Sequence, residues 1–205
     1  NLGGDLPRMF SSGFAIEVPL IDTTRYLNYL EARLSKAGGV VQEMTPLAKL
    51  IDVSTEFDLI VNCSGIGAKE LAPDSEMIPH RGQVAVVAKL DLPYAVVCDD
   101  APLMYAIPRA TDCVIGGTNH VSADLRPWPA ETLRMIEEAA RVLAISPPRL
   151  VQESVGLRPF RRAGVRVARE QLADGRAVIH NYGHGGAGFT LSWGCADAAV
   201  ALVAN

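Results

Sequence analysis

Residues 57–68 read Phe-Asp-Leu-Ile-Val-Asn-Cys-Ser-Gly-Ile-Gly-Ala, an apolar run that ends in small residues. Residues 57–62 lack the polar alternation of a half-exposed strand, so they predict a strand covered on both faces, as in a parallel sheet. Open α/β sheets bind ligands at the carboxyl ends of their strands, and small residues from Cys63 and Ser64 onward leave room for one. The alternative is a tight strand-to-helix turn.

The segments on either side of this strand predict an α/β layer. A helix capped by Thr23 or Thr24 extends to about residue 37, where Gly38-Gly39 ends it, and residues 40–43 then read as a short strand. Towards the C-terminus, further strands are predicted at residues 165–168 and 177–181, with one more at 150–155 just before the layer resumes, and a helix that is apolar nearly all round, and therefore predicted to be buried, follows at 188–203.

The middle of the chain has a different pattern. Short β-rich runs separated by Pro, Asp and Gly predict an antiparallel sheet, at residues 83–89, 94–98, 103–107 and 112–116. An amphipathic helix, Pro129–Leu143, comes next. The sequence thus predicts a mixed α/β fold: an α/β layer from residues 23–79 and 156–205, an inserted antiparallel-sheet domain at 80–155, and residues 1–22 as a segment of that domain.

Composition excludes several classes of protein. The chain has 205 residues, 49% hydrophobic and 20% charged, with a net charge of −4, which is ordinary for a globular protein and argues against nucleic acid or an anionic membrane as partner. No apolar run approaches about 18 residues, so no membrane-spanning helix is predicted. The four cysteines form no CxxC pair, which argues against zinc or another metal and predicts reduced thiols in the cytoplasm.

Residues 180–190 read His-Asn-Tyr-Gly-His-Gly-Gly-Ala-Gly-Phe-Thr and lead directly into the last predicted helix. A glycine-rich turn at a helix N-terminus brings backbone N–H groups and the positive end of the helix dipole close to a flat or anionic ligand. The alternative is a plain left-handed turn. Residues 183–188 have the letters GxGxxG but not the context of a dinucleotide pyrophosphate site, because they lie near the C-terminus and no acidic residue follows at the required spacing.

Two further side chains are candidates for ligand binding. Arg158 lies between Leu157 and Pro159, and a partly buried guanidinium suits a carboxylate held by two hydrogen bonds, with a structural ion pair as the alternative. Tyr105 lies between apolar residues on a short strand. Such a tyrosine is usually a core residue with a satisfied hydroxyl, and the alternative is that its hydroxyl meets a ligand.

Together these segments resemble the D-amino-acid oxidase family, which includes D-aspartate oxidase. The stretches that carry the resemblance are IDTTRYLNYLEARL (21–34), DLIVNCSGIGAKELAPD (58–74), RGQVAVV (81–87), YAIPR (105–109), VIGGT (114–118), VGLRPFR (155–161) and IHNYGHGGAGFTLSWGCA (179–196). The family begins with a GxGxxG half that holds the ADP part of FAD, and no such motif is present. With no initiator Met either, we expect a fragment, or one half of a split protein, that binds FAD weakly without its N-terminal half.

The resemblance assigns roles by position. Arg158 pairs with the substrate carboxylate, the hydroxyl of Tyr105 also bonds it, and the carbonyl of Gly186 receives the substrate amino group. The isoalloxazine ring of FAD is contacted by Gly185, Gly188, Phe189 and Thr190.

The remaining assignments concern the other end of FAD and the substrate side chain. Cys63 and Ser64 lie near the ribose and pyrophosphate, and Thr45 contacts the adenine through its backbone. Ile107 lines the side-chain pocket. Ala101 replaces a lid tyrosine found in many members, four residues before Tyr105, so the pocket is expected to be more open.

The implied reaction is FAD-dependent oxidation of a D-amino acid by hydride transfer, with O₂ as the second substrate and an oxo acid, ammonia and hydrogen peroxide as products. The pocket positions Val96, Ala101, Tyr105 and Ile107 bring no cation, which favours neutral D-amino acids. Two alternatives stay open: a sister flavin oxidase acting on glycine or a secondary amine, and a non-catalytic subunit of a split flavoprotein. Whether the protein is a monomer or a homodimer is also open.

Overall fold

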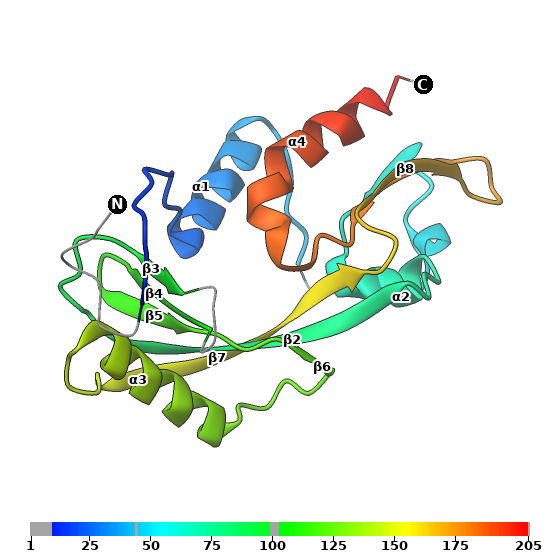
Figure 1. The fold of residues 1–205 in the computed structure, drawn as a ribbon. Coiled ribbons are helices and arrows are strands. Elements are labelled where there is room, and N and C mark those ends of the chain that lie inside the picture. The colour runs from blue at the N-terminus through cyan, green and yellow to red at the C-terminus, as the bar shows by residue number, and fades with distance from the viewer. Residues whose placement is uncertain (1–9, 44, 99–102, 205) are drawn as a thin grey trace. The chain divides into compact units, whose positions relative to one another are not determined.

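The computed structural model of the chain describes residues 10–43, 45–98 and 103–204 (Figure 1). The chain divides into two compact units. Unit 1 comprises Asn1–Thr45, Ala85–Gly116 and Thr132–Gln152, and unit 2 comprises Pro46–Val84, Gly117–Glu131 and Glu153–Asn205. Three elements contribute residues to both units: β2 (Met77–Ala88), β7 (Leu150–Arg161) and α3 (Pro129–Leu143).

Unit 1 contains an antiparallel sheet. Strands β3 (Val96–Cys98), β4 (Met104–Pro108) and β5 (Asp112–Gly116) lie next to one another in that order, and β2 follows β5 in the same sheet. Ala106 of β4 lies opposite Val96 on one side and Ile115 on the other. The antiparallel sheet predicted for this region is therefore confirmed.

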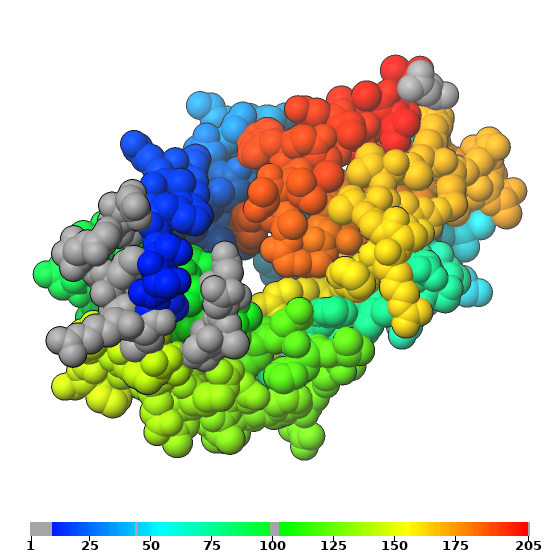
Figure 2. Space-filling model, in the orientation of Figure 1, coloured from blue at the N-terminus to red at the C-terminus, as the bar shows by residue number. Residues whose placement is uncertain are grey.

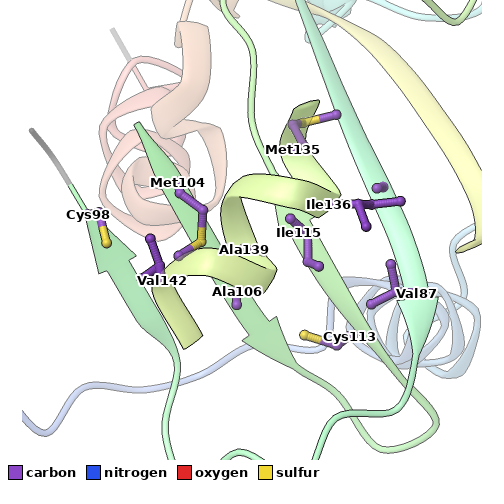
Figure 3. Packing of buried hydrophobic residues seen from close by; sticks show 11 residues of the cluster. Val87, Cys98, Met104, Ala106, Cys113, Ile115, Met135, Ile136, Ala139 and Val142 are labelled. Carbon is purple, nitrogen blue, oxygen red and sulfur yellow. The ribbon is translucent and has the colours of Figure 1, made fainter. Parts of the chain in front are cut away.

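One face of this sheet and one face of α3 form the core of unit 1 (Figure 3). Ala106 and Ile115 are fully buried, and Met135 of α3 is 1% exposed. The buried residues of α3 recur at helical spacing, as the sequence predicted. The helix begins at a proline, whose missing N–H removes no intrahelical hydrogen bond at that position.

Helix α1 (Thr23–Lys36) confirms the helix predicted near the N-terminus. Gly38 has φ +86°, and the N–H of Gly39 donates to the carbonyl of Leu34 at 3.0 Å, so the glycine pair ends the helix as predicted. The strand predicted for residues 40–43 is wrong. Val40 is 88% exposed, and an apolar run becomes a strand only where a neighbouring strand supplies hydrogen-bond partners.

Unit 2 contains a second sheet with the order β1–β9–β8. Its strands are β1 (Leu59–Asn62), β8 (Arg166–Gln171) and β9 (Ala177–Tyr182). The strand predicted at residues 57–62 forms as β1 and pairs in parallel with β9, while β8 pairs with β9 antiparallel. The expected burial of both faces of this strand is wrong among the described residues, because Ile60 is buried whereas Val61 is 50% exposed.

The remaining elements of unit 2 are short, except for the last helix. They are η1 (Leu50–Asp52), η2 (Gly65–Gly67), α2 (Ala68–Leu71), η3 (Gly185–Ala187), α4 (Gly188–Ala201) and β6 (His120–Val121), which pairs with β2. No helix in the described part of the chain is long and apolar enough to cross a membrane.

Helix α4 confirms the predicted C-terminal helix but not its predicted burial. It contacts β8 and β9, and Arg169 of β8 donates to the carbonyl of Leu202 just beyond its end. Ala199 is its one buried residue among those described, while Trp193 is 55% exposed. The helix accordingly lies at the molecular surface, in orange and red in Figure 2. The apolar composition of α4 predicted burial, but a helix is buried only where other segments of the polypeptide cover it.

The units follow boundaries different from the predicted domain ranges. Residues 23–45 belong to unit 1 and residues 117–131 to unit 2. The assignment of 23–79 with 156–205 to a cofactor layer, and of 1–22 and 80–155 to a substrate domain, concerns ligands and stays a prediction.

Candidate active site

The candidate site of unit 2 lies at the sheet edge where two parallel strands end. Leu59 lies opposite Ala177, and Asn62 lies opposite His180, so β1 and β9 are in register up to the end of β1. The segments that follow them, residues 63–67 and 183–188, therefore leave from the same edge. This edge is where open α/β sheets bind ligands.

The loop after β9 needs glycine at two positions. Gly183 has φ +89° and Gly185 has φ +55°, both in the left-handed region. A Cβ on Gly183 would also lie 2.8 Å from the Cβ of Arg161. The alternative of a left-handed turn is thus part of the structure, and the turn leads into α4 at Gly188 as predicted.

This turn presents backbone to the outside. No side chain among the described residues caps the N-terminus of α4, so its first N–H groups can donate to a ligand. Gly186, Phe189 and Thr190 are exposed, and Gly185 and Gly188 are half-buried. The loop leaves its backbone accessible, and the roles assigned to these five residues stay predictions.

Arg158 lies beside this loop, on β7. Its Nη1 donates to the carbonyl of Thr118 at 2.9 Å, and its Cδ would lie 3.5 Å from a Cβ on Gly186. The guanidinium occupies the space above Gly82, where a Cβ would be 2.2 Å from Nη1. Within the described residues Arg158 has no carboxylate partner, so the alternative of a structural ion pair does not hold there.

Tyr105 lies in unit 1, on the face of β4 opposite the core. Its neighbours Met104 and Ala106 are buried in the core, whereas Tyr105 is half-buried and is not part of that core, and the role of its hydroxyl stays a prediction. Its ring covers Gly116, since a Cβ there would lie 2.0 Å from Cζ. Ile107 has the same orientation two residues along the strand.

The predicted side-chain pocket needs one correction. Val96 lies opposite Ala106 and packs against the core of unit 1, whereas its neighbour Val97 lies opposite Tyr105 and is 61% exposed. Side chains alternate along a strand, so Val96 lies on the core face of the sheet and not on the face that Tyr105 occupies. Ala101 lies outside the described residues.

The residues predicted to lie near the nucleotide end of FAD belong to different units. Cys63 and Ser64 follow β1 in unit 2, and both the N–H and the hydroxyl of Ser64 donate to Oδ1 of Asn62, at 3.2 and 2.7 Å. Thr45 is exposed at the end of unit 1, and its hydroxyl donates to the carbonyl of Glu43. The four cysteines are free, and the described residues contain no cluster that could hold a metal ion.

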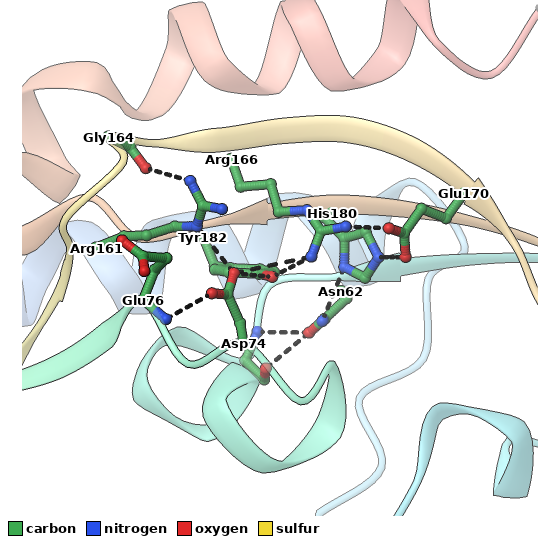
Figure 4. A network of polar contacts seen from close by, with 10 residues as sticks. Asn62, Asp74, Glu76, Arg161, Gly164, Arg166, Glu170, His180 and Tyr182 are labelled. Carbon is green, nitrogen blue, oxygen red and sulfur yellow. Dashed lines mark hydrogen bonds and ion pairs between the residues drawn. The ribbon is translucent and has the colours of Figure 1, made fainter.

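A buried carboxylate next to this edge was missed by sequence reasoning (Figure 4). Asp74 is 7% exposed, and its Oδ2 accepts hydrogen bonds from Nε of Arg161 and from the hydroxyl of Tyr182, each at 2.8 Å. The N–H of Glu76 donates to Oδ1 at 3.0 Å. Burial by itself would raise the pKa of Asp74, but these hydrogen bonds outweigh it and hold the pKa below its usual range.

A second chain of contacts crosses the same sheet. Nδ1 of His180 lies 3.2 Å from Nδ2 of Asn62, and Nε2 lies 2.9 Å from Oε2 of Glu170. Arg166 joins the two groups, because it donates both to Glu170 and to the hydroxyl of Tyr182. Asn62 and His180 lie 118 residues apart in sequence, so no local motif signals their contact.

Comparisons with known proteins agree on one family. A model of FAD-dependent oxidoreductases, DAO, matches residues 10–202. The D-amino-acid oxidase of Rubrobacter xylanophilus is 40% identical over 97% of this chain and 61% of its own length. The D-aspartate oxidase of Homo sapiens is 37% identical over 88% of this chain and 53% of its own length. The chain therefore spans less than two thirds of either relative.

Solved structures support the fold. Iminodiacetate oxidase from a Chelativorans species aligns with 73% of this chain and 43% of its own, with a TM-score of 0.59 and 16% identity. Glycine oxidase from Bacillus cereus covers 68% of this chain and 40% of its own, with a TM-score of 0.57 and 19% identity. At these identities the likeness concerns the fold alone.

Proposed function

Because the chain belongs to the DAO family of FAD-dependent oxidoreductases, we propose that this protein oxidises D-amino acids. The substrate gives up its α-hydrogen as a hydride and a proton from its nitrogen, which leaves an imino acid. Water hydrolyses the imino acid to a 2-oxo acid and ammonia. When bound, FAD would supply the two-electron acceptor for this hydride, and O₂ would take up the two electrons together with two protons and leave as hydrogen peroxide.

The glycine loop and the start of α4 suit the flavin end of FAD. Exposed Gly186 brings no side chain between the backbone and a flat ring, and the N-terminus of α4, which no side chain among the described residues caps, would present the positive end of the helix dipole to it. Phe189 and Thr190 would add ring and hydroxyl contacts. Cys63 and Ser64 follow the neighbouring strand end, where the ribose and pyrophosphate would lie, and Thr45 would contact the adenine.

The substrate would be held by its two charged groups. Arg158 would bind the carboxylate through two parallel N–H donors, and the hydroxyl of Tyr105 would donate a further hydrogen bond. The carbonyl of Gly186 would accept from the amino group. These residues orient the α-hydrogen, and no side chain has to act as a base if the amine binds neutral.

Arg158 is the observation that carries the proposal. A half-buried guanidinium with no carboxylate partner in the described residues, held beside an exposed glycine loop, is the arrangement that an α-carboxylate ligand requires. Arg161, three residues along the same strand, is paired with Asp74 instead.

The direct test is anaerobic reduction of the flavin in the full-length protein. We expect D-alanine to bleach the flavin absorption and L-alanine to leave it unchanged, and air to restore the spectrum with one hydrogen peroxide per turnover. Bleaching by glycine or a secondary amine but not by D-alanine would support the sister oxidases instead. A protein that binds no flavin would contradict the proposal.

Arg158→Leu should abolish useful turnover. The loss of a charge-assisted pair in a partly buried site costs about 2–5 kcal/mol, which is roughly 30- to several-thousand-fold in kcat/KM. Arg162→Leu is the matched control, because Arg162 lies four residues along and is exposed. Steady-state kinetics with D-alanine measures both variants, and activity of the Arg158 variant within a few-fold of the parent would overturn the assignment.

A further inference from the structure

The strand that carries Arg158 and the glycine loop contact each other along several residues in unit 2. Phe160 of β7 forms a β-bridge with His184, and its ring carbon Cδ2 would lie 3.5 Å from a Cβ on Gly185. The side chain of Arg161 covers Gly183. The position of Arg158 relative to Gly186 therefore depends on how β7 is held against this loop.

Asp74 is connected to both sides of this contact. Through Nε of Arg161 it holds the end of β7, three residues after Arg158. Through the hydroxyl of Tyr182 it holds the end of β9, one residue before the loop begins at Gly183. Both donors meet the same oxygen, Oδ2, so a single carboxylate fixes the distance between the two strand ends.

The segment that carries Asp74 is itself tied to β7. The N–H of Glu76 donates to Oδ1 of Asp74, and the carbonyl of Glu76 accepts from the N–H of Arg162 at 3.1 Å. Asp74 is thus surrounded by donors on both oxygens and is buried, with 7% of its surface exposed. Removal of this carboxylate would leave the buried donors around it without their acceptor, which is costly.

We propose that Asp74 is a positioning residue that sets Arg158 and the carbonyl of Gly186 at the spacing a D-amino acid requires. The inference rests on the proposed function. Asp74 acts through Arg161 and Tyr182. Its removal should therefore disturb recognition of the substrate carboxylate rather than the chemistry of the flavin.

The test compares Asp74→Asn with Asp174→Asn in the full-length, FAD-loaded protein. An amide offers one carbonyl oxygen, so its NH₂ group must face either the Glu76 N–H or the two donors at Oδ2. Asp174 is the matched control, because its Oδ2 also accepts from an arginine, Nε of Arg176 at 2.8 Å, but in the turn between β8 and β9.

The readout is kcat/KM for D-alanine and for D-alanine amide, which lacks the carboxylate. A displacement of Arg158 by a fraction of an ångström to 1 Å should lower kcat/KM for D-alanine by about 10- to 100-fold. The amide should lose less than threefold, so the ratio of the two substrates falls in Asp74→Asn and stays at the parent value in Asp174→Asn. An unchanged ratio in Asp74→Asn would overturn the positioning role.

Tyr182→Phe tests the same link if Asp74→Asn does not fold. It removes the hydroxyl, which donates to Asp74 and accepts from Arg166, and keeps the ring in its apolar cluster. The ratio should fall in the same direction, and a parent-like ratio would again count against the proposal. A parent protein that oxidises neither substrate would overturn the proposed function, and with it the role of Asp74.

Discussion

At the scale of single residues, two glycines determine where the candidate substrate-binding side chains can lie. The guanidinium of Arg158 occupies the space above Gly82, and the ring of Tyr105 occupies the space above Gly116. Each glycine belongs to a β-strand, where glycine is otherwise unfavourable, and each leaves room for a side chain that would clash with any Cβ. Neither glycine was singled out as a site residue from the sequence, because the clash involves a side chain from another strand.

Gly82→Ala should impair catalysis with little effect on stability. The new Cβ would lie 2.2 Å from Nη1 of Arg158, and the flexible end of that side chain can move away from it. We expect kcat/KM for D-alanine to fall by about 10- to 100-fold, with KM raised and flavin content unchanged. Gly156→Ala on β7 is the control, because its Cβ would meet nothing within 4 Å. Equal kinetics for the two variants would contradict this role for Gly82.

At the scale of elements, the β1–β9–β8 sheet depends on buried polar contacts as well as apolar packing. Oδ1 of Asn62 accepts from Ser64, so its Nδ2 faces His180. Nδ1 of His180 must then accept a hydrogen bond, which leaves its proton on Nε2 to donate to Glu170. A fully buried, neutral histidine therefore joins the three strands.

Protonation of His180 should make stability depend on pH. Burial lowers the pKa of His180, and the charge of Arg166 adds to this, against an opposing effect of Glu170. The unfolded chain, with an ordinary pKa near 6.5, then binds more protons than the folded protein below that pH. The free energy of unfolding should thus fall as the pH drops from about 6.5 towards the folded pKa, by up to about 1.4 kcal/mol per pH unit.

Urea unfolding at pH 7.5 and 5.5 measures this effect. In His180→Gln the side-chain amide can still donate to Glu170, but it takes up no proton, so the loss of stability between the two pH values should be smaller than in the parent. His184, whose pKa burial also lowers, accounts for part of the remaining dependence. The same loss of stability in parent and variant would show that His180 does not titrate on unfolding.

At the scale of the whole molecule, the residues proposed to meet the substrate include no cation besides Arg158. Tyr105 and Ile107 lie on one face of β4, and Val97 lies opposite Tyr105. An acidic substrate side chain would lose its hydration there without gaining a counter-charge. The relatives do not decide the matter, since a D-amino-acid oxidase and a D-aspartate oxidase match at 40% and 37% identity.

The full-length protein should therefore prefer neutral D-amino acids. We expect kcat/KM for D-alanine and D-methionine to exceed that for D-aspartate by at least tenfold, because one uncompensated charge costs more than about 1.4 kcal/mol. D-asparagine, which has nearly the shape of D-aspartate without its charge, is the matched substrate. If D-aspartate is preferred to D-asparagine, a cation from elsewhere in the protein reaches the pocket.

The sequence by itself determined most of the elements and their kind. The apolar run at 57–62 and the amphipathic helix Pro129–Leu143 needed only their local sequence pattern, and Gly183 and Gly185 needed only the left-handed backbone that glycine allows. The candidate roles of Arg158, Tyr105 and Gly186 also came from the sequence, through its resemblance to a family.

Tertiary structure alone decided which side chains meet and which faces are covered. Asp74 binds partners 87 and 108 residues away, and Gly82 makes room for an arginine on another strand, relations that no local pattern encodes. The strand expected at 40–43 did not form because no neighbouring strand pairs with it, and α4 stayed exposed despite its apolar composition. Whether a residue is buried or hydrogen-bonded across strands depends on the segment that lies opposite it. Only folding brings that segment into place.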